Sequence, residues 1–426
     1  MASNILDLKN VSIAVIGLGY VGLPLAIAFA KKYPTSGFDI SRNRIRELKD
    51  NFDNTLEVSK SKIKKSNLTL TDDINTLKNV KVFIVTVPTP VNSRTKPDLS
   101  FLESACQDMA KILKKNAVII FESTVYPGCT EEICIPILEK YSNLKLNKDF
   151  FVGYSPERIN PGDSVHTFEK INKVVSGSSE KSLNFIYKLY KSVIDAKVHK
   201  AASIKVAEAS KVIENTQRDI NIALMNELSE ICFKLDIKTS EVLKASNTKW
   251  NFLNFRPGLV GGHCIGVDPY YLSYKSQQLG VNPAMILSGR KTNNAVVSRV
   301  VNQTLGRLSK KKSIQKILIM GISFKENCPD TRNSGSVSVI KQFNKLGITP
   351  FIHDPNYPTD TTSFKAKFHH ISELFADENK FDAILLLVPH KEYLSITPSM
   401  LRSKLRAKGH VFDMTNALEQ SDFFSL

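Results

Sequence analysis

Short apolar runs alternate with segments of helical composition along the first part of the chain. Such runs occupy 11–16, 80–87 and 117–122, and a further short strand is predicted at 35–40. Continuous apolar runs of this length, followed by turns rich in glycine or proline, are typical of parallel strands buried on both faces. The segment 23–32 between the first two predicted strands has helical composition. Strands alternating with helices predict a doubly wound α/β domain, with functional loops at the carboxyl ends of the strands.

A different pattern begins near residue 201. No glycine or proline occurs from 201 to 235, and apolar residues recur at helical spacing. The positions are Ile204, Val206, Ala207, Ile213, Ile220, Ala223, Leu224 and Leu228. A helix of ~30 residues is long for a globular protein, so we expect it to bridge two domains and to offer a face for a homodimer. Helical patterning continues to about residue 301 around a glycine-rich loop.

The strand and helix alternation resumes after the basic segment 309–313. Apolar strands are predicted at 317–320, 348–354 and 381–388. The second α/β domain therefore covers about 313–426. The first domain is predicted at 1–200, and a central helical segment at 201–308 lies between them.

Charge and length exclude some classes of protein. The chain has 426 residues, too many for one ordinary core, and no apolar run approaches the ~20 residues that span a bilayer. The first ten residues lack the regions of a signal peptide, so a cytoplasmic location is expected. The net charge of +17 is dispersed and has no nucleic-acid motif. We expect no nucleic-acid or membrane partner; the basic surface either attracts an anionic small substrate or is simply solvated.

Six cysteines lie far apart, with no CxxC pair. This spacing argues against a metal site and, in a cytoplasmic protein, against a disulfide framework. Buried packing is the ordinary role of a free cysteine. Cys264 differs, because glycines and a proline surround it in the stretch 261–269, and it is a candidate nucleophile.

The first predicted strand leads into Gly17-Leu18-Gly19-Tyr20-Val21-Gly22. This GxGxxG spacing between a strand and a helix is typical of dinucleotide binding, because it lets pyrophosphate approach the helix N-terminus. Asp39 follows about 20 residues later, where an acidic residue binds the ribose hydroxyls and repels a 2′-phosphate. NAD is therefore favoured over NADP, although Arg44 is available to a phosphate or to adenine. The alternative is a glycine turn without a ligand.

Two further groups are candidates on spacing alone. Lys211 and Asn215 are four residues apart on the long helix and share one face, where they would stabilise an oxyanion or position a water. Solvated surface is the alternative. The turn 154–162, which contains Glu157, either lines a site or is a charged surface turn. His263 is adjacent to Cys264, and adjacent side chains usually point apart, so we do not expect it to be the base. A nearby lysine or a helix terminus would activate the thiol instead.

These motifs together resemble the nucleotide-sugar 6-dehydrogenases, the family of UDP-glucose, GDP-mannose and UDP-N-acetylhexosamine dehydrogenases. The resemblance covers nearly the whole chain and keeps the order of the motifs. They are GLGYVGLPLA at 17–26, VPTP at 87–90, ESTVYPG at 122–128, SPERINPG at 155–162, AEASKVIEN at 207–215, FRPGLVGGHCIGVDP at 255–269 and GISFKENCPDTRNS at 321–334. It implies two Rossmann-like doubly wound domains joined by a long central helix and a helical dimerisation segment. The first domain would bind NAD and the last the UDP-sugar.

The resemblance also implies roles for individual residues. Cys264 matches the family's nucleophile, and Lys211, Asn215, Asp268, Glu157 and Thr124 match the other catalytic residues. Positions implied to bind the cofactor are Gly17, Gly19, Tyr20, Val21, Gly22, Asp39, Arg44, Pro88, Thr89, Thr124 and Arg332. Positions implied to bind the substrate are Glu157, Arg158, Asn160, Lys211, Asn215, Phe255, Arg256, Gly258, Gly262 and Lys325.

Two departures concern the substrate. Pro161 stands where members acting on UDP-glucose carry an acidic residue, and Val267 where they commonly carry lysine. The sequence resembles the branch that oxidises UDP-N-acetylglucosamine or UDP-N-acetylgalactosamine to the uronic acid for capsule and O-antigen synthesis. Pro161 also makes Glu157 the leading candidate for the proton carrier. UDP-glucose or UDP-N-acetylmannosamine remains an alternative substrate.

The predicted reaction is a four-electron oxidation of a primary alcohol with two NAD in succession, through a thiohemiacetal and a thioester on Cys264. A single-step β-hydroxyacid dehydrogenase is the rival enzyme, since it shares the N-terminal domain and the long helix but needs no thiol. A basic module that retains NAD only as a ligand is the rival of another class.

Overall fold

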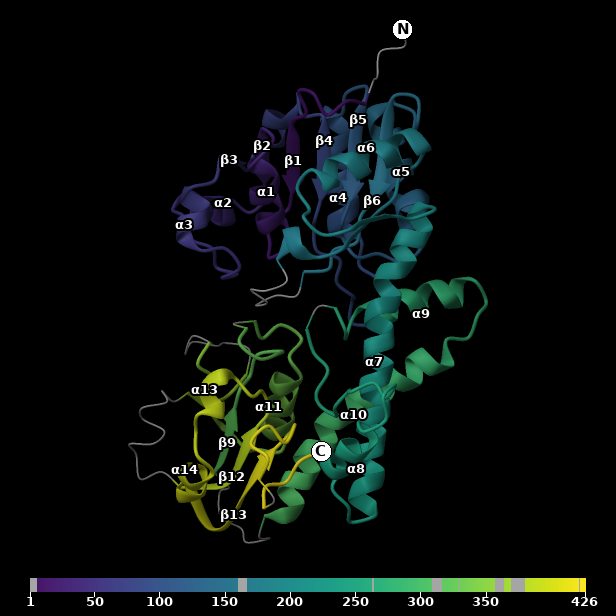
Figure 1. Ribbon diagram of the computed structural model, residues 1–426. Helices are drawn as coiled ribbons and strands as arrows, with labels where there is room; N and C mark the ends of the chain where they lie inside the picture. The colour runs from purple at the N-terminus through teal and green to yellow at the C-terminus, as the bar shows by residue number, and fades with distance from the viewer. Residues whose placement is uncertain are drawn as a thin grey trace. The chain divides into compact units, whose positions relative to one another are not determined.

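The computed structural model describes residues 6–159, 167–262, 264–308, 316–328, 330–356, 364–368, 380–420 and 422–426. The chain divides into two compact units (Figure 1). Unit 1 comprises Met1–Glu214 and Tyr270–Asn282, and unit 2 comprises Asn215–Pro269 and Pro283–Leu426. Two helices cross the division: α7 (Ile204–Lys234) and α9 (Asp268–Gln278).

A six-stranded parallel sheet forms the centre of unit 1. Its strands are β1 (Ile13–Ile16), β2 (Thr35–Phe38), β3 (Leu68–Thr71), β4 (Val82–Val85), β5 (Ala117–Phe121) and β6 (Phe150–Tyr154). Their order is β3-β2-β1-β4-β5-β6, which is the Rossmann order with its switch point between β1 and β4. Two further strands, β7 (Lys173–Val175) and β8 (Val198–Lys200), pair in parallel as a separate small sheet.

Helices connect and cover these strands (Figure 1). They are α1 (Gly22–Ala30), α2 (Arg42–Lys49), α3 (Lys60–Lys64), α4 (Ser100–Ile112), α5 (Ile135–Ser142) and α6 (Glu180–Lys191). Short helical turns occur at Ile74–Leu77, Thr130–Cys134 and Phe168–Lys170. One core cluster joins Val15 and Ile84 of the sheet to Phe29 of α1 and Leu189 of α6. The alternate strand residues, such as Phe83, are equally buried, so both faces of the sheet are covered.

Unit 2 contains a five-stranded parallel sheet of order β11-β10-β9-β12-β13. Its strands are β9 (Ile317–Met320), β10 (Phe351–His353), β11 (Lys367–Phe368), β12 (Phe381–Leu386) and β13 (Leu405–Asp413). Its helices, besides its part of α7, are α8 (Thr239–Ser246), α10 (Ala284–Arg307), α11 (Gly335–Lys345), α13 (Lys391–Leu394) and α14 (Pro398–Ser403).

Two hydrophobic clusters cover the two faces of this second sheet. Ile319 and Leu385 pack with Val300 of α10 and Phe343 of α11. On the alternate positions, Leu318 and Ile384 pack with Tyr393 of α13 and Leu401 of α14, among others. Alternation of the buried residues between two helical layers is what a doubly wound sheet requires. The predicted fold class, with two Rossmann-like domains, is confirmed.

The predicted elements occur near their expected places and are mostly shorter. β1 begins at Ile13 rather than at residue 11, and β12 ends at Leu386 although the apolar run continues to Val388. The long helix begins at Ile204, because the Ser203 hydroxyl accepts a hydrogen bond from the Val206 amide and caps it. The three predicted domain boundaries stay a prediction. Among the described residues, no helix is long and apolar enough to cross a membrane.

Candidate active site

The loop after β1 has the geometry of a dinucleotide-binding turn. Gly17 has φ +93°, and a Cβ at Gly22 would lie 1.9 Å from the Gly17 carbonyl oxygen. A Cβ at Gly19, in contrast, would have no atom within 4 Å. Val21 precedes α1 without a side-chain cap bond. Gly17 and Gly22 therefore close the turn, while Gly19 leaves space beside a helix N-terminus, which fits a pyrophosphate.

Asp39 lies directly after β2 and fixes this loop. Its Oδ2 accepts a hydrogen bond from the Leu18 amide at 2.9 Å, and its Oδ1 accepts one from the Ser41 amide at 2.9 Å. A carboxylate accepts about four hydrogen bonds, so two such bonds leave capacity for ribose hydroxyls. The position fits the residue that recognises the NAD ribose.

Arg44 makes its hydrogen bonds inside unit 1. Its Nε donates to the Leu18 carbonyl oxygen at 2.9 Å, and its Nη2 donates to Asp53 Oδ1 at 2.7 Å. Asn54 accepts from Nη1 at 2.9 Å. Arg44 therefore stabilises the glycine loop through the Leu18 carbonyl oxygen. Its predicted contact with a phosphate or with adenine stays a prediction.

The loops after β4 and β5 meet at two threonines. The Thr89 hydroxyl donates to the Thr124 carbonyl oxygen at 2.6 Å. The buried Tyr271 of α9 donates to the carbonyl oxygen of Thr89 at 2.9 Å. Both loops follow carboxyl ends of parallel strands, which is where ligands of doubly wound sheets bind. The predicted cofactor contacts of Pro88, Thr89 and Thr124 are consistent with this position and stay predictions.

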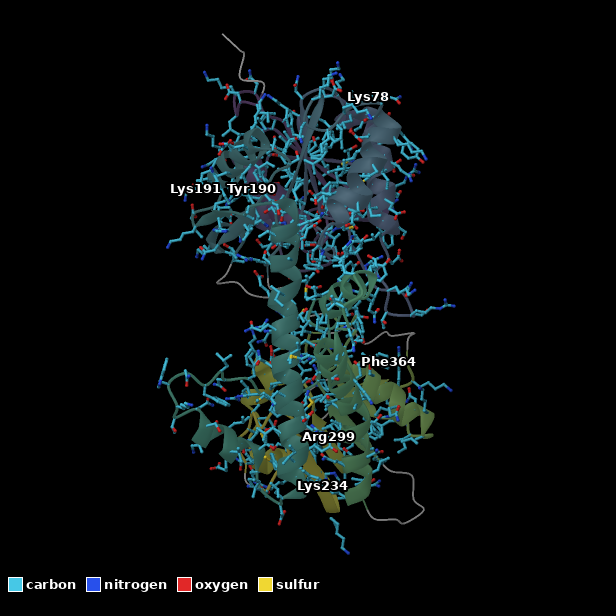
Figure 2. All side chains as sticks on the ribbon, turned by 90° about the vertical axis from the view of Figure 1, so that its right-hand side faces the viewer. Lys78, Tyr190, Lys191, Lys234, Arg299 and Phe364 are labelled. Atoms are coloured by element: carbon cyan, nitrogen blue, oxygen red, sulfur yellow. The ribbon has the colours of Figure 1, made fainter. Side chains whose placement is uncertain are left out.

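Glu157 lies in a buried polar cluster after β6. Its Oε1 accepts hydrogen bonds from the amides of Arg158, at 2.6 Å, and Ile159. Its Oε2 lies 3.3 Å from the Lys173 ammonium of β7. The same ammonium lies 2.5 Å from Glu122 Oε2, and the Tyr190 hydroxyl of α6, labelled in Figure 2, donates to Glu122 Oε1.

The two carboxyl groups of this cluster differ in proton affinity. Burial raises the pKa of Glu122 to about 8, which Lys173 opposes and the charge of Glu157 reinforces. Burial also disfavours ionisation of Glu157, but Lys173, Glu122, the Ile159 amide and Lys211 outweigh it and lower the pKa of Glu157. At neutral pH, therefore, Glu157 is ionised and Glu122 holds the proton.

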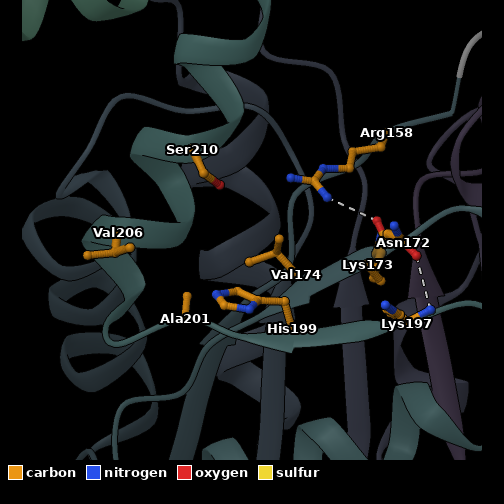
Figure 3. A pocket seen from close by; sticks show the side chains of 9 residues that line it. All are labelled: Arg158, Asn172, Lys173, Val174, Lys197, His199, Ala201, Val206 and Ser210. Atoms are coloured by element: carbon orange, nitrogen blue, oxygen red, sulfur yellow. Dashed lines mark hydrogen bonds between the residues drawn. The ribbon is translucent and has the colours of Figure 1, made fainter.

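A cavity of about 380 Å³ lies beside this cluster (Figure 3). Its lining residues are Arg158, Asn172, Lys173, Val174, Lys197, His199, Ala201, Val206 and Ser210. Arg158 is held there by a hydrogen bond to the Asn172 carbonyl oxygen at 3.0 Å and by an ion pair with Glu214. The substrate contact predicted for Arg158 stays a prediction.

Lys211 lies within the first turns of α7 and is only 7% exposed. Three residues before it, the Glu208 carboxylate accepts hydrogen bonds from the amides of Gly128, at 2.5 Å, and Thr130, at 2.9 Å. Glu208 thereby ties the loop that follows Thr124 to this part of the helix. Burial excludes the alternative that Lys211 is a solvated surface residue.

In unit 2, Asn215 and Asp268 are hydrogen-bonded to one another. The Asn215 Nδ2 donates to Asp268 Oδ2 at 2.6 Å, and Asp268 is 1% exposed. The Asp268 amide donates at 2.9 Å to the carbonyl oxygen of Cys264, so the cysteine stands in the turn that begins α9. Cys264 is partly exposed, whereas the other five cysteines are buried. A helix N-terminus favours a thiolate, as a nucleophile requires.

The glycines before Cys264 permit close packing. Gly262 has φ +83°, and a Cβ there would lie 2.7 Å from the Phe324 ring. Its amide donates to the Asn333 carbonyl oxygen at 3.2 Å. Lys325, predicted to bind substrate, lies with its ammonium 5.9 Å from the centre of the Phe324 ring. The cysteine loop and the Lys325 loop are thus packed together within unit 2.

The segment Phe255–Leu259 is anchored by Asn226 of α7. The Asn226 side chain donates to the Gly258 carbonyl oxygen at 3.0 Å and accepts from the Gly258 amide at 2.8 Å. Arg299, labelled in Figure 2, donates to the Asn226 carbonyl oxygen at 2.7 Å. Arg256 is exposed on this anchored segment, and its predicted contact with substrate stays a prediction.

Other predicted positions are less enclosed or lie outside the described residues. Arg332 is exposed and paired with Asp330 at 2.6 Å. Tyr20 and Val21 are partly buried in the glycine loop, and Phe255 is partly buried. Asn160, Pro161 and His263 lie outside the described residues.

Family models match three successive parts of the chain. The NAD-binding domain of the UDP-glucose/GDP-mannose dehydrogenase family matches residues 11–194, its central domain residues 205–295, and its UDP-binding domain residues 318–420. The chain belongs to the UDP-glucose/GDP-mannose dehydrogenase family. The resemblance inferred from the motifs is therefore confirmed.

Individual relatives agree with this assignment. The chain is 49% identical to protein CapL of Staphylococcus aureus, over 97% of both chains. It is 46% identical to the UDP-N-acetyl-D-glucosamine 6-dehydrogenase of Pseudomonas aeruginosa, over 97% of this chain and 98% of the relative. The solved UDP-D-ManNAc dehydrogenase of Pyrococcus horikoshii superposes with a TM-score of 0.85 at 29% identity, over 97% of this chain and 98% of that structure.

The dehydrogenase uses NAD, as predicted, and its substrate is a UDP-sugar. The residues of the glycine loop and Asp39 fit NAD by the geometry described above. The roles predicted for all individual site residues, those of the glycine loop included, stay predictions.

The sequence analysis missed several polar residues that organise the site. They are Glu122, Lys173, Tyr190, Glu208 and Asn226. Glu122 and Glu208 stand within the recognised motifs, but nothing in their spacing indicates what they contact. Lys173 is followed directly by two buried valines, and a lysine next to buried apolar residues in a short strand is the one available signal of a buried ion pair.

Proposed function

We propose that this dehydrogenase oxidises the C6 hydroxyl of a UDP-N-acetylhexosamine, UDP-N-acetylglucosamine or UDP-N-acetylgalactosamine, to the uronic acid. The supporting observation is the 46% identity with a UDP-N-acetyl-D-glucosamine 6-dehydrogenase over nearly the full length of both chains. Identity with the solved UDP-D-ManNAc dehydrogenase is 29%. The higher identity favours the gluco or galacto sugar over the manno sugar.

The chemistry is assigned to residues of this chain as follows. Bound NAD supplies a hydride acceptor for each of the two oxidations. Lys211, or water bound beside it, takes the proton of the C6 hydroxyl. The Cys264 thiolate adds to the aldehyde carbon, and Lys211 with Asn215 stabilises the oxyanion. The second oxidation leaves a thioester on Cys264.

Hydrolysis of the thioester completes the reaction. Water attacks the carbonyl carbon while Glu157 accepts its proton, and the carbon–sulfur bond breaks. Asp268 and Thr124 are assigned to orient this water. The support for Glu157 is its lowered pKa, since a general base must be ionised at the pH of reaction.

A substrate panel tests the proposal. NADH formation is followed with UDP-N-acetylglucosamine, UDP-N-acetylgalactosamine, UDP-N-acetylmannosamine, UDP-glucose and GDP-mannose at equal concentration. We expect kcat/KM for one of the first two to exceed the others by at least about tenfold, equivalent to ~1.4 kcal/mol. A preference for UDP-glucose or UDP-N-acetylmannosamine would contradict the proposed substrate class.

We further propose that the dehydrogenase is a homodimer through α7. Val206, Ile213, Leu224 and Ile231 are each about half exposed. At about 100° per residue their spacing keeps all four within about 20° of one line along the helix. An apolar stripe of this kind favours a partner helix. Replacing Ile213 and Leu224 by glutamate should give a monomer by light scattering, whereas Ile40→Glu, at an exposed site of unit 1, should not.

The location and pathway follow from the same family resemblance. We propose that the enzyme works in the cytoplasm and that its UDP-uronic acid serves capsule or O-antigen synthesis. Both nucleotide substrates are cytoplasmic metabolites, which supports the proposed location.

A further inference from the structure

The cluster of Glu122, Lys173 and Tyr190 has no role in the reaction assigned so far. All three side chains are essentially buried, at 1%, 2% and 0% exposure. Burying an ammonium, a carboxyl group and a phenol costs free energy unless they are paired and hydrogen-bonded. Each of the three contacts another member of the cluster, and Lys173 also contacts Glu157, the residue assigned to water activation.

The geometry links the four groups in one chain of contacts. The Tyr190 hydroxyl donates to Glu122 Oε1, and Lys173 lies 2.5 Å from Glu122 Oε2 and 3.3 Å from Glu157 Oε2. The ammonium also lies 5.3 Å from the centre of the Phe168 ring and 5.7 Å from that of Tyr190. Aromatic faces on this side hold the ammonium between the two carboxyl groups.

When two carboxyl groups lie beside one ammonium, the state in which one of the two is protonated is favoured. If both were ionised, two negative charges would lie beside the single ammonium of Lys173. The groups come from four elements: Glu122 follows β5, Glu157 follows β6, Lys173 lies on β7 and Tyr190 on α6. Lys211 of α7 adds a further positive charge that acts on Glu157.

We propose that Glu122, Lys173 and Tyr190 are positioning residues for Glu157, with Lys173 fixing its carboxylate and Glu122 holding the proton that the pair shares. This inference rests on the proposed function, in which Glu157 accepts a proton from the hydrolytic water. Lys173 and the amides of Arg158 and Ile159 aim the carboxylate. Tyr190 fixes Glu122 so that Lys173 remains between the two acids.

The step it serves is thioester hydrolysis. A water oxygen bonds to the carbonyl carbon, its proton passes to Glu157, and the carbon–sulfur electron pair leaves on Cys264 as thiolate. Glu157 then releases the proton to solvent. No redox change occurs in this step, so it is separable from both hydride transfers.

The pH dependence distinguishes a proton-sharing pair from a simple structural ion pair. Glu122 titrates at a pKa of about 8. Its ionisation adds negative charge beside Glu157, which makes Glu157 a stronger base. The hydrolysis rate of the wild type should therefore rise through an apparent pKa near 8, and Glu122→Gln should remove that inflection.

The experiment follows the covalent adduct on Cys264 by intact-protein mass in single turnover with UDP-N-acetylglucosamine and excess NAD. Glu157→Gln and Lys173→Met should slow decay of the adduct at least tenfold, while the rate of the first NADH changes less than threefold. Tyr190→Phe should have a smaller effect in the same direction. Lys31→Met, which removes the more exposed Lys31–Glu169 pair of the same unit, should match the wild type.

The outcomes separate this inference from the proposed function. Normal adduct decay in Glu157→Gln would contradict its role as the base and overturn the inference with it. Slow decay in Glu157→Gln, with normal decay and an unchanged pH profile in Lys173→Met and Glu122→Gln, overturns the inference alone. If Lys173→Met fails to fold, Glu122→Gln decides by its pH profile, since an unchanged inflection near pH 8 in this variant overturns the inference.

Discussion

The two parallel sheets end in loops of the same construction but with different surroundings. Each first strand, β1 or β9, is followed by a glycine with positive φ, Gly17 at +93° and Gly321 at +84°. Each second strand is followed by an aspartate that accepts a loop amide. Asp39 accepts from Leu18 at 2.9 Å, and Asp354 accepts from Ile322 at 2.7 Å.

The difference begins two residues after the glycine. In unit 1 this position is Gly19, where a side chain would meet no atom within 4 Å. In unit 2 it is Ser323, which is buried and donates to the Lys325 carbonyl oxygen at 2.9 Å. The first loop has open space at this position, whereas the second has a buried side chain that bonds to its own loop.

The aspartates differ in the same way. Asp39 is partly exposed and accepts from two backbone amides, which leaves its carboxylate capacity for a ribose. Asp354 Oδ2 lies 3.1 Å from His390 Nε2, and His390 Nδ1 accepts from the Asn327 amide at 2.9 Å. The imidazole therefore carries its proton on Nε2 and joins both ends of the loop. The same construction thus leaves an open loop that fits a dinucleotide in unit 1 and a loop braced by its own side chains in unit 2.

The largest effect is expected from filling the space in unit 1. Gly19→Val should raise the Kd for NAD about 100-fold, equivalent to ~2.8 kcal/mol, because the side chain occupies the place of the pyrophosphate. Isothermal calorimetry with NAD and with UDP measures both ligands. Affinity for UDP should not change, and a variant that binds NAD normally would show that the two loops do not differ as described.

A smaller effect is expected from the aspartates. Asp39→Asn should lower the preference for NAD over NADP by roughly 20-fold, because the charge that repels a 2′-phosphate is lost. The ratio of kcat/KM for the two cofactors measures this preference. Asp354→Asn is the matched variant and should leave the ratio unchanged; an equal fall in both variants would remove the distinction between the loops.

His390 should affect substrate and not cofactor. His390→Phe removes the acceptor for the Asn327 amide and the partner of Asp354, so the Lys325 loop loses its support. We expect the KM for the UDP-sugar to rise roughly fivefold and the KM for NAD to stay within twofold. Initial-rate kinetics with each substrate varied in turn measures both constants, and a larger rise for NAD would contradict the assignment.

The smallest effect is expected in how the stability of the two loops depends on pH. Burial raises the pKa of Glu122 to about 8 and that of Glu208 to about 7, above the ordinary carboxyl range. Their contribution to stability is present below about pH 4.5 and is lost as the pH rises through 7 to 8. Burial raises the proton affinity of Asp354, but His390 and two amides outweigh it and lower its pKa, so its contribution is lost as pH falls below about 4.

Hydrogen exchange measures separately the pH range in which each of the two loops loses stability. Protection factors at 122–128 should fall as the pH rises from about 4.5 to 8, and those at 321–327 should fall as the pH drops below about 4. Glu122→Gln should weaken the alkaline change in unit 1 and leave the acid change in unit 2. Loss of protection over the same pH range in both loops would contradict the opposite pKa shifts of Glu122 and Asp354.

Much of the fold could be predicted because it depends on local pattern. The apolar runs that became β1, β4 and β5 are buried on both faces, and a continuous run is the direct signature of that environment. The glycine loop and Asp39 could also be predicted, since their spacing reflects the turn itself. Some predicted strands are longer than the observed ones, because apolar residues such as Val87 and Val388 continue past the strand ends into the loops.

The polar contacts of the site could not be predicted, because the partners are distant in sequence. Lys173 meets Glu122 from 51 residues away, and Glu208 meets Gly128 from 80 residues away. Arg44 illustrates the same limit: nothing in its spacing indicates that its guanidinium binds Asp53 and the Leu18 carbonyl oxygen. Sequence spacing indicates which residues share an element, and it does not indicate which elements meet.

We propose that Cys264 enables this enzyme to oxidise its substrate twice. The most direct measurement is the number of NADH molecules formed for each UDP-N-acetylglucosamine consumed at completion, with the acid product quantified in parallel. The account predicts two NADH and one uronic acid for the wild type, and loss of acid formation in Cys264→Ser. One NADH per sugar in the wild type, or undiminished acid formation in Cys264→Ser, would contradict it.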